Sequence, residues 1–216
     1  MNKLLLTNDA SPTLFSSRYN QIYHSTHGAL SESMHIFMLN GIEKLKHLPE
    51  INVFEMGFGT GLNAVLALKF SKIHQIPMYY ETVEKHPLDS TTIFEYQKHL
   101  PTYKEEFKSI HGAKWNETTC LTDIFKFKKL ECSLENHMLD PLFHVIFFDA
   151  FSPNSQPELW TEEIFKNMYQ GLIPNGFLVT YCAKGIVKRT LKQAGFEVHT
   201  LPGPPGKREM VMGLKK

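Results

Sequence analysis

Three glycines at alternate positions, Gly57, Gly59 and Gly61, constrain the fold of this chain more than any other feature. They follow a short apolar run at residues 53–56, and a helical pattern begins directly after them, which predicts a strand, a tight turn and a helix N-terminus. Side chains at these positions would keep the backbone from closing on a ligand. The N–H groups at the helix start carry a partial positive charge. We therefore expect the loop to bind the acidic end of a nucleotide-like cofactor.

The spacing of the glycines indicates which cofactor the loop binds. A dinucleotide-binding loop needs a third glycine three positions after the second, and this chain has Leu62 there. The spacing matches instead the first motif of class I S-adenosylmethionine methyltransferases, in which the loop faces an amino-acid carboxylate. A glycine-rich turn in any other α/β sheet is the alternative interpretation. The residues of this stretch that we expect to bind the cofactor are Glu55, Gly57, Phe58, Gly59, Thr60, Gly61 and Asn63.

Strand and helix patterns alternate from residue 51 onward. Apolar runs that predict strands occupy residues 53–56, 78–83, 119–121, 143–148, 176–182, 196–201 and 209–214. The predicted helices between them span residues 63–71, 88–99, 158–170 and 184–194. This alternation predicts a doubly wound, mostly parallel α/β sheet, which binds ligands at the carboxyl ends of its strands.

Residues 1–50 do not follow this alternation. Two apolar runs, at 4–6 and 13–15, flank a turn-rich spacer and predict a short hairpin, and residues 29–48 carry apolar side chains at helical spacing. We expect this segment to pack beside or over the mouth of the sheet. The predicted organisation is therefore an N-terminal hairpin and helix appendage over residues 1–50, followed by a cofactor-binding domain over residues 51–216.

Acidic residues follow three of the predicted strands. Glu84, next to Lys85, ends the second strand, where a carboxylate can accept hydrogen bonds from both ribose hydroxyls of a nucleoside. Asp123 follows the third strand, where it can accept from an adenine amino group while Ile124 packs on the ring. Asp149 closes the fourth. Each acid taken alone also fits a solvated turn or a helix cap, but together with the glycines they favour a nucleoside site.

The position of Asp149 suggests a reaction for such a site. Transfer of a sulfonium methyl group to a neutral amine produces an ammonium, and a carboxylate beside that nitrogen stabilises the developing charge. The same carboxylate also favours the unreactive protonated amine, so Asp149 must orient a neutral amine or accept its proton. Phe151 lies two residues further on and can stack on a planar substrate ring, or it is a core aromatic residue under the loop.

Four sequence blocks in this order point to one family, and they lie at residues 57–63, 83–88, 148–153 with 159–161, and 206–210. They resemble the methyltransferase half of the bifunctional bacterial tRNA 5-methylaminomethyl-2-thiouridine biosynthesis proteins, and the similarity runs from about Tyr19 to Gly213. The resemblance implies a Rossmann-like class I methyltransferase fold with a seven-stranded sheet. It also implies methyl transfer from S-adenosylmethionine to the exocyclic amine of 5-aminomethyl-2-thiouridine at the tRNA wobble position.

The resemblance also assigns roles to individual positions. It places Gly57, Gly59, Gly61, Glu84 and Asp123 in the cofactor pocket and Asp149 at the amine. It implies that RNA phosphates contact a basic group consisting of Lys184, Lys188, Arg189, Lys207 and Arg208. The flavin-dependent half of the bifunctional proteins has no counterpart in these 216 residues, so we expect a separate enzyme or pathway to supply the aminomethyl-uridine.

The distribution of charged, apolar and metal-ligating residues bears on the partners, the location and the metal content of the protein. Residues 184–216 hold eight basic and two acidic residues, while the preceding residues hold fifteen basic and twenty acidic ones, which fits either a polyanion footprint or a solvated helix face. No apolar run reaches the length of a membrane span and no signal-like stretch opens the chain, so we expect a cytoplasmic protein. Three widely separated cysteines and the histidine spacings form no recognisable metal pattern, and we expect no metal.

Two other functions remain open at this point. An N-methyltransferase for a small-molecule or protein amine would need the same Asp149, and its activity would depend less on salt than binding to RNA does. A non-catalytic cofactor-binding or RNA-binding module would keep the loop without turnover. A nicotinamide oxidoreductase is disfavoured because Leu62 stands where that family needs glycine.

Overall fold

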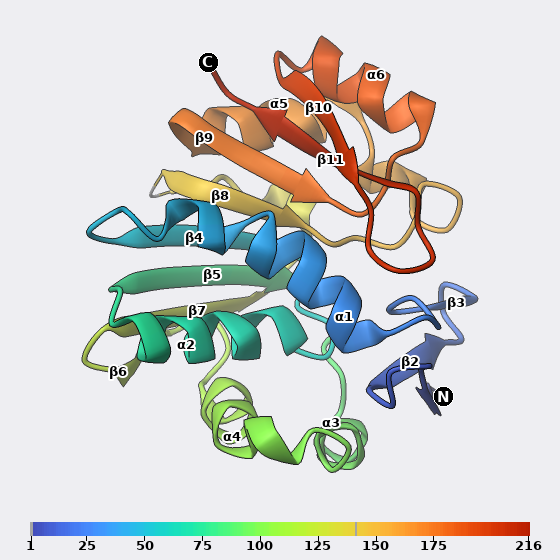
Figure 1. Ribbon diagram of the computed structural model, residues 1–216, viewed down its shortest axis with the longest axis vertical. Coiled ribbons are helices and arrows are strands. Elements are labelled where there is room, and N and C mark those ends of the chain that lie inside the picture. Colours follow the sequence, from blue (N-terminus) through green and yellow to red (C-terminus); the bar gives the residue numbers. More distant parts are fainter. Residues whose placement is uncertain (1, 141) are drawn as a thin grey trace.

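A single eight-stranded sheet forms the centre of the molecule in the computed structural model, which describes residues 2–140 and 142–216 (Figure 1). Its strand order is β10-β11-β9-β8-β4-β5-β7-β6. The strands are β4 (Ile51–Met56), β5 (Met78–Glu84), β6 (Thr118–Thr122), β7 (Phe125–Glu131), β8 (Phe143–Phe148), β9 (Leu172–Thr180), β10 (Glu197–Pro202) and β11 (Glu209–Leu214). Strands β4, β5, β7, β8 and β9 pair in parallel, which confirms the mostly parallel α/β sheet.

The sheet has one strand more than the expected seven because residues 118–131 form a hairpin. The predicted strand at 119–121 is β6, an edge strand that runs antiparallel to β7. Strand β7 is the third parallel strand, and it alternates between buried Phe125, Phe127 and Lys129 and more exposed residues. Its three lysines hide this period-2 pattern, because a lysine in an inward position breaks the apolar alternation that marks a strand.

Helices cover both faces of the sheet, as a doubly wound topology requires. The longer helices are α2 (Leu62–His74), α3 (Ser90–Gln97), α4 (Lys104–Gly112), α5 (Glu162–Gly171) and α6 (Gly185–Gln193). The buried apolar side chains form two core clusters. Helices α2 and α4 contribute to one of them, and α5 and α6 contribute to the other. The sequence analysis did not predict α4. It also predicted that α5 starts at residue 158, whereas the helix starts at Glu162, because Thr161 caps it by accepting a 3.3 Å hydrogen bond from Ile164 N. Within the described residues, no helix is long and apolar enough to cross a membrane.

The N-terminal segment forms a small sheet of its own and then a broken helix. Strands β1 (Lys3–Leu6), β2 (Pro12–Ser16) and β3 (Gln21–Ile22) make an antiparallel three-stranded sheet, beside which α1 (Ala29–Ser33) begins (Figure 1). The helix predicted over 29–48 is divided into α1, a π-helical segment at Met34–Leu39 and a 3-10 turn at Ile42–Leu45. A break occurs at Gly41, where a Cβ would lie 2.2 Å from the Phe37 carbonyl oxygen. The domain boundary at residue 50 stays a prediction.

The described part of the chain also holds four short 3-10 turns, at Ile42–Leu45, Pro101–Tyr103, Leu134–Asn136 and Pro157–Leu159. Strands β4, β5, β7 and β8 pair in parallel, so they all end at the same edge of the sheet. The turn at Leu134–Asn136 lies near this edge, because it follows the carboxyl end of β7. The N-terminal sheet lies at that edge, while the β6–β7 turn lies at the other (Figure 1).

Candidate active site

The carboxyl ends of β4, β5, β7 and β8 open into one cavity of about 300 Å³. The glycine loop, the end of β5, the segment after β7 and the start of the loop after β8 form one side, and residues 19–25 of the N-terminal segment form the other. Of the predicted site residues, the cavity brings together Gly57, Phe58, Gly59, Thr60, Asn63, Glu84, Lys85, Asp149, Phe151 and Lys207. Among those predicted to bind the cofactor, Glu55, Gly61, Asp123 and Ile124 do not line it.

The glycine loop needs glycine for two physical reasons. Gly57, Gly59 and Gly61 have φ values of 92°, 49° and 76°, a region that side chains disfavour. A Cβ on Gly57 would also lie 2.7 Å from the Asp149 carbonyl oxygen, so the loop and the end of β8 are in close contact. Gly61 is the N-cap of α2, and a Cβ there would meet Phe58 and His111 at 2.9 Å rather than fill the cavity. The loop thus leaves an open cradle of backbone at the start of a helix, which suits the cofactor predicted from its spacing.

Glu84 holds the loop from the end of β5. Its carboxylate accepts a 3.0 Å hydrogen bond from Gly59 N and a 2.8 Å hydrogen bond from His86 N. The same side chain lines the cavity, as does Lys85. Glu84 therefore lies at the cavity, and its carboxylate fixes the glycine loop; its contact with the cofactor stays a prediction.

Asp123 and Ile124 were misplaced by the sequence analysis, and the structure corrects this. They occupy the turn between β6 and β7, and β7 starts at Phe125, which pairs with Met78 at the amino end of β5. Because parallel strands share a direction, this turn lies at the edge of the sheet opposite the glycine loop. The cavity is lined instead by four residues after the carboxyl end of β7, namely Cys132, Ser133, Leu134 and Glu135.

Asp149 lies at the end of β8 with its carboxyl group held from α2. Asn63 Nδ2 donates a 3.0 Å hydrogen bond to Asp149 Oδ2. Burial raises the pKa of Asp149 to about 7, and the negative charge of Glu32 acts in the same direction, while the Asn63 hydrogen bond and the positive charge of Lys207 lower it. The carboxyl group therefore changes its protonation state near neutral pH, which is the range a general base needs.

Glu55 lies beneath the cavity rather than in its wall. Its side chain is fully buried in β4, and its two carboxyl oxygens make no hydrogen bond of good geometry. Burial raises the pKa of Glu55 to about 8, with a further contribution from the charge of Asp149, although the polar side chains of Thr82, Asn63 and Tyr80 partly offset this rise. Glu55 is therefore neutral at pH 7 and lies too deep to face a ligand in the cavity.

Aromatic side chains from distant segments form one wall of the cavity. The Tyr19 ring stacks on Phe151 with 4.4 Å between centroids, and Tyr23 meets Phe151 edge-on at 5.0 Å. Tyr181, which follows β9, donates a 2.9 Å hydrogen bond to the Ala150 carbonyl oxygen. Phe151 is thus a cavity residue and not a core aromatic. The sequence analysis missed the three tyrosines, because no local pattern marks an N-terminal residue that folds back over a sheet.

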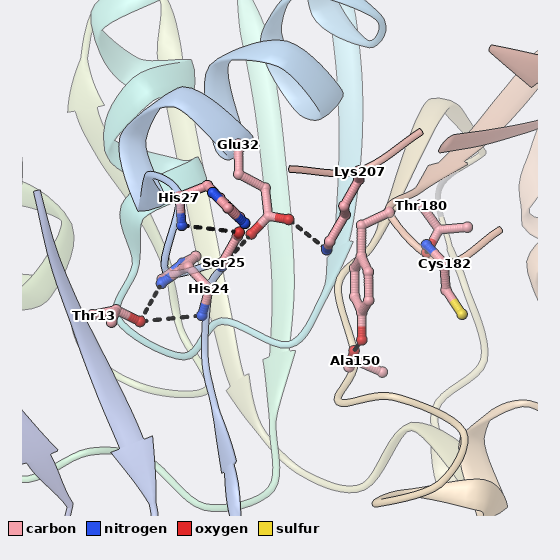
Figure 2. A network of polar contacts seen from close by, with 10 residues as sticks. Thr13, His24, Ser25, His27, Glu32, Ala150, Thr180, Cys182 and Lys207 are labelled. Carbon is pink, nitrogen blue, oxygen red and sulfur yellow. Dashed lines mark hydrogen bonds and ion pairs between the residues drawn. The ribbon is translucent and has the colours of Figure 1, made fainter. Parts of the chain in front are cut away.

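An ion pair and a buried histidine complete the same wall (Figure 2). Lys207 Nζ lies 2.5 Å from Glu32 Oε1, and Ser25 N donates a 2.7 Å hydrogen bond to Glu32 Oε2. Lys207 Nζ also lies 4.0 Å from the centroid of the Tyr181 ring. His24 is buried beside this pair, and burial lowers its pKa to about 4, so it is neutral at pH 7. The sequence analysis assigned Lys207 to RNA but missed Glu32 and His24.

The remaining predicted RNA-binding residues lie outside the cavity. Lys184, Arg189 and Arg208 are exposed, whereas Lys188 pairs with Glu209 at 2.7 Å. Their contact with RNA stays a prediction.

The parallel sheet with helices on both faces defines a Rossmann-like α/β protein, and the glycine loop and the carboxyl group after β8 form a candidate cofactor site at the carboxyl ends of its strands. A comparison with known families specifies it further. The chain belongs to the S-adenosyl-L-methionine-dependent methyltransferases, since residues 94–216 match a family with that description. S-adenosylmethionine is therefore its cofactor, as the glycine spacing predicted.

Several curated relatives are similar along nearly the whole chain. The tRNA 5-methylaminomethyl-2-thiouridine biosynthesis bifunctional protein MnmC of Cupriavidus metallidurans is 28% identical over 96% of this chain. The protein of the same name from Ectopseudomonas mendocina is 30% identical over 92% of it. In both cases the chain spans only 33% of the length of the relative. The family resemblance seen in the sequence blocks is thereby confirmed.

Solved structures confirm the fold. The crystal structure of MnmC2 from Aquifex aeolicus superposes with a TM-score of 0.79, at 24% identity, over 99% of this chain and 70% of that one. Spermidine synthase from Thermotoga maritima gives a TM-score of 0.62, at 13% identity, over 99% of this chain and 68% of that one. These likenesses establish a Rossmann-like methyltransferase architecture.

Proposed function

We propose that this protein transfers a methyl group from S-adenosylmethionine to the exocyclic amine of 5-aminomethyl-(2-thio)uridine at the wobble position of tRNA. The printed names of the curated relatives supply the substrate. The observation that carries the proposal is the position of Asp149, whose carboxyl group lines the same cavity as the glycine loop and titrates near neutral pH. This combination suits an amine that must lose a proton before it can accept a methyl group.

The cofactor fits the glycine side of the cavity. The backbone of Gly57 and Gly59 would lie against its amino-acid end, Glu84 would accept from its ribose hydroxyls, and the segment 132–135 would border its base. The backbone at Gly59 supports this fit, because a Cβ there would project toward Tyr23, another residue that lines the cavity, at 3.1 Å. When bound, the cofactor supplies an electrophilic methyl group on a sulfonium.

Asp149 has two tasks in this proposal. An amine arrives mostly as an ammonium at neutral pH, and its nitrogen has no free electron pair in that form. The ionised Asp149 accepts one proton from the nitrogen and becomes a neutral carboxylic acid, which frees the electron pair for the methyl carbon. Asn63 keeps the carboxyl group oriented throughout, since it donates to Oδ2. After the transfer the neutral acid releases its proton to water, and the restored carboxylate lies beside the methylated nitrogen, which is positive.

The aromatic wall fits a planar base. Phe151, with Tyr19 stacked on it and Tyr23 at its edge, contributes aromatic ring surface to the lining of the cavity. Proteins that recognise single-stranded RNA stack splayed-out bases on such rings. A wobble uridine that has left the anticodon stack would place its 5-substituent toward Asp149 from this position.

Positive charge outside the cavity fits the rest of the tRNA. Exposed Lys184, Arg189 and Arg208 lie on α6 or its N-cap and on the loop before β11, where they would contact phosphates. A tRNA substrate would place the enzyme in the cytoplasm. Supply of the aminomethyl-uridine by a separate enzyme or pathway belongs to the same proposal.

The test is methyl transfer to tRNA that lacks the modification. Purified protein, cofactor labelled in its methyl group and aminomethyl-containing tRNA should yield label in the wobble nucleoside after digestion. Asp149→Asn should bind the cofactor with unchanged affinity and transfer at least a hundredfold more slowly, because general base catalysis typically contributes about that much. Label that stays out of the anticodon with active wild-type protein would refute the proposal.

Salt dependence separates this substrate from a free amine. Binding to tRNA releases counterions, so kcat/KM should fall steeply between low and physiological salt. Methylation of a small-molecule amine should change much less over the same range. A flat salt profile together with activity on free amines would favour the second enzyme hypothesis.

A further inference from the structure

An ion pair joins two distant segments of the chain inside the cavity. Glu32 lies on α1 and Lys207 in the loop between β10 and β11, and their side chains meet at 2.5 Å (Figure 2). Both residues line the same cavity as Asp149. The Glu32 side chain is only 8% exposed, so its charge acts in a medium where water screens weakly. The pair is thus placed to influence the carboxyl group that faces the substrate.

Other contacts fix the pair in place. Ser25 N donates to the second carboxyl oxygen of Glu32 at 2.7 Å. Lys207 Nζ lies over the Tyr181 ring, and the Tyr181 hydroxyl donates to the carbonyl oxygen of Ala150, the neighbour of Asp149. The positions of both charges relative to Asp149 are therefore set by hydrogen bonds and packing, not by a flexible side chain alone.

Charged and titratable groups surround Asp149 from several elements. Glu32 and Lys207 act on it with opposite signs, and Asn63 donates a hydrogen bond to it. The titratable groups that interact electrostatically with it from other elements are Glu55 on β4, Tyr80 on β5 and Tyr181 after β9. All three are protonated near pH 7, so Glu32 and Lys207 are the two full charges among these groups.

We propose that Glu32 and Lys207 are a positioning pair that sets the basicity of Asp149, with Glu32 making the carboxylate a stronger proton acceptor and Lys207 a weaker one. This inference rests on the proposed function, in which Asp149 accepts a proton from the bound amine. Neither residue takes part in proton or methyl transfer. Their balance keeps Asp149 basic enough to accept a proton from an ammonium, yet ionised in an appreciable fraction of molecules at neutral pH.

The opposing charges explain why the pair suits proton transfer to Asp149 better than either charged residue alone would. Glu32 without Lys207 would keep Asp149 protonated at neutral pH, and a protonated carboxyl group cannot accept the proton of the amine. Lys207 without Glu32 would leave a weak base and a positive charge close to where the amine nitrogen becomes positive. A second interpretation makes the pair a purely structural clasp between α1 and the β10–β11 loop. That interpretation predicts a change in stability but no change in the titration of Asp149.

The titration of Asp149 can be measured without cofactor or tRNA. Protein labelled with ¹³C at aspartate side-chain carboxyl carbons gives one resonance for Asp149, assigned by its loss in Asp149→Asn. Glu32→Gln should lower the midpoint by about one pH unit, and Lys207→Met should raise it by less, since Glu32 is the stronger of the two influences. The double variant should titrate between the two single variants. The acid limb of the pH profile of kcat/KM should move in the same directions.

Two control variants make the result decisive. Lys188→Met breaks the Lys188–Glu209 pair, which also joins two elements but lies outside the cavity, and it should leave the Asp149 midpoint unchanged. Glu32→Asp retains the charge, so its midpoint should stay within a few tenths of a pH unit of wild type. Single variants that are folded but titrate like wild type, or that shift in the same direction, would overturn the inference. Shifts in the expected directions without any methylation of tRNA would leave the charge coupling standing and remove the proposed substrate instead.

Discussion

Asn63 in the first turn of α2 donates a 3.0 Å hydrogen bond to Asp149 at the end of β8. The bond directly connects the helix that follows the glycine loop with the carboxyl group after β8. Asn63 is 3% exposed and its Nδ2 donates to a carboxylate, a type of hydrogen bond that is stronger than a neutral one. The geometry of the loop is therefore linked to the chemistry of Asp149.

Asn63→Ala should raise the pKa of Asp149 further, because the hydrogen bond from Asn63 lowers it in the wild type. A hydrogen bond to a charged group is worth roughly 1.5–3 kcal/mol, so we expect the acid limb of kcat/KM to rise by about one to two pH units. Transfer should be slow at pH 7 and recover at higher pH. An acid limb that stays in place would show that this bond does not control the protonation of Asp149.

Gly57→Ala should disrupt the loop. The new Cβ would meet the Asp149 carbonyl oxygen at 2.7 Å in a backbone conformation with φ of 92°, which costs about 1–3 kcal/mol in strain alone. We expect a lower free energy of unfolding in urea and no measurable affinity for the cofactor by calorimetry. Gly112→Ala at the end of α4 is the matched control, since a Cβ there has no atom within 4 Å. Equal behaviour of the two variants would contradict the close contact at Gly57.

The sequence predicted the parallel part of the sheet because its strands are continuous apolar runs. Residues 143–148 form β8 as expected, and the glycine loop occupies the predicted turn between β4 and α2. The pattern misled us at residues 119–131, where Lys129 points inward. Its Nζ is nearly inaccessible and donates to the carbonyl oxygens of Ile110 and His111 at the end of α4. These hydrogen bonds join residues 19 and 18 positions apart, and the local hydrophobicity pattern does not predict them.

Glu84→Ala should weaken cofactor binding in two ways. It removes the carboxylate predicted to accept from the ribose, and it leaves Gly59 N and His86 N without their acceptor. The combined loss should be roughly 1–3 kcal/mol in binding free energy, measured by calorimetry. Glu95→Ala, on α3 and outside this cavity, is the control and should leave the affinity unchanged. A wild-type affinity for Glu84→Ala would move the ribose site elsewhere.

The candidate site was predictable only where it lies on the sheet. Glu84 and Asp149 could be predicted because they end or follow strands, and the alternation of strands and helices fixes the edge of the sheet at which they lie. Tyr23, Glu32 and Lys207 reach the same cavity from distant segments, and Glu32 and Lys207 are 175 residues apart in the sequence. No periodicity connects such segments. The partner of Lys207 is an acid on the N-terminal helix, and only the folded chain shows this ion pair.

Glu55→Gln should change how stability depends on pH. Burial raises the pKa of Glu55 from 4.5 to about 8 in the folded chain, so the folded state binds more protons than the unfolded state between these values. The free energy of unfolding therefore falls as pH rises through this interval, by roughly 1.4 kcal/mol per pH unit for one such group. Glutamine retains the shape but cannot ionise. Urea unfolding at pH 5 and pH 8.5 should show a much smaller fall for the variant than for the wild type, and the two proteins should differ least at pH 5. Parallel pH dependences would mean that Glu55 is ionised in the folded chain, and that the floor of the cavity carries a negative charge next to Asp149.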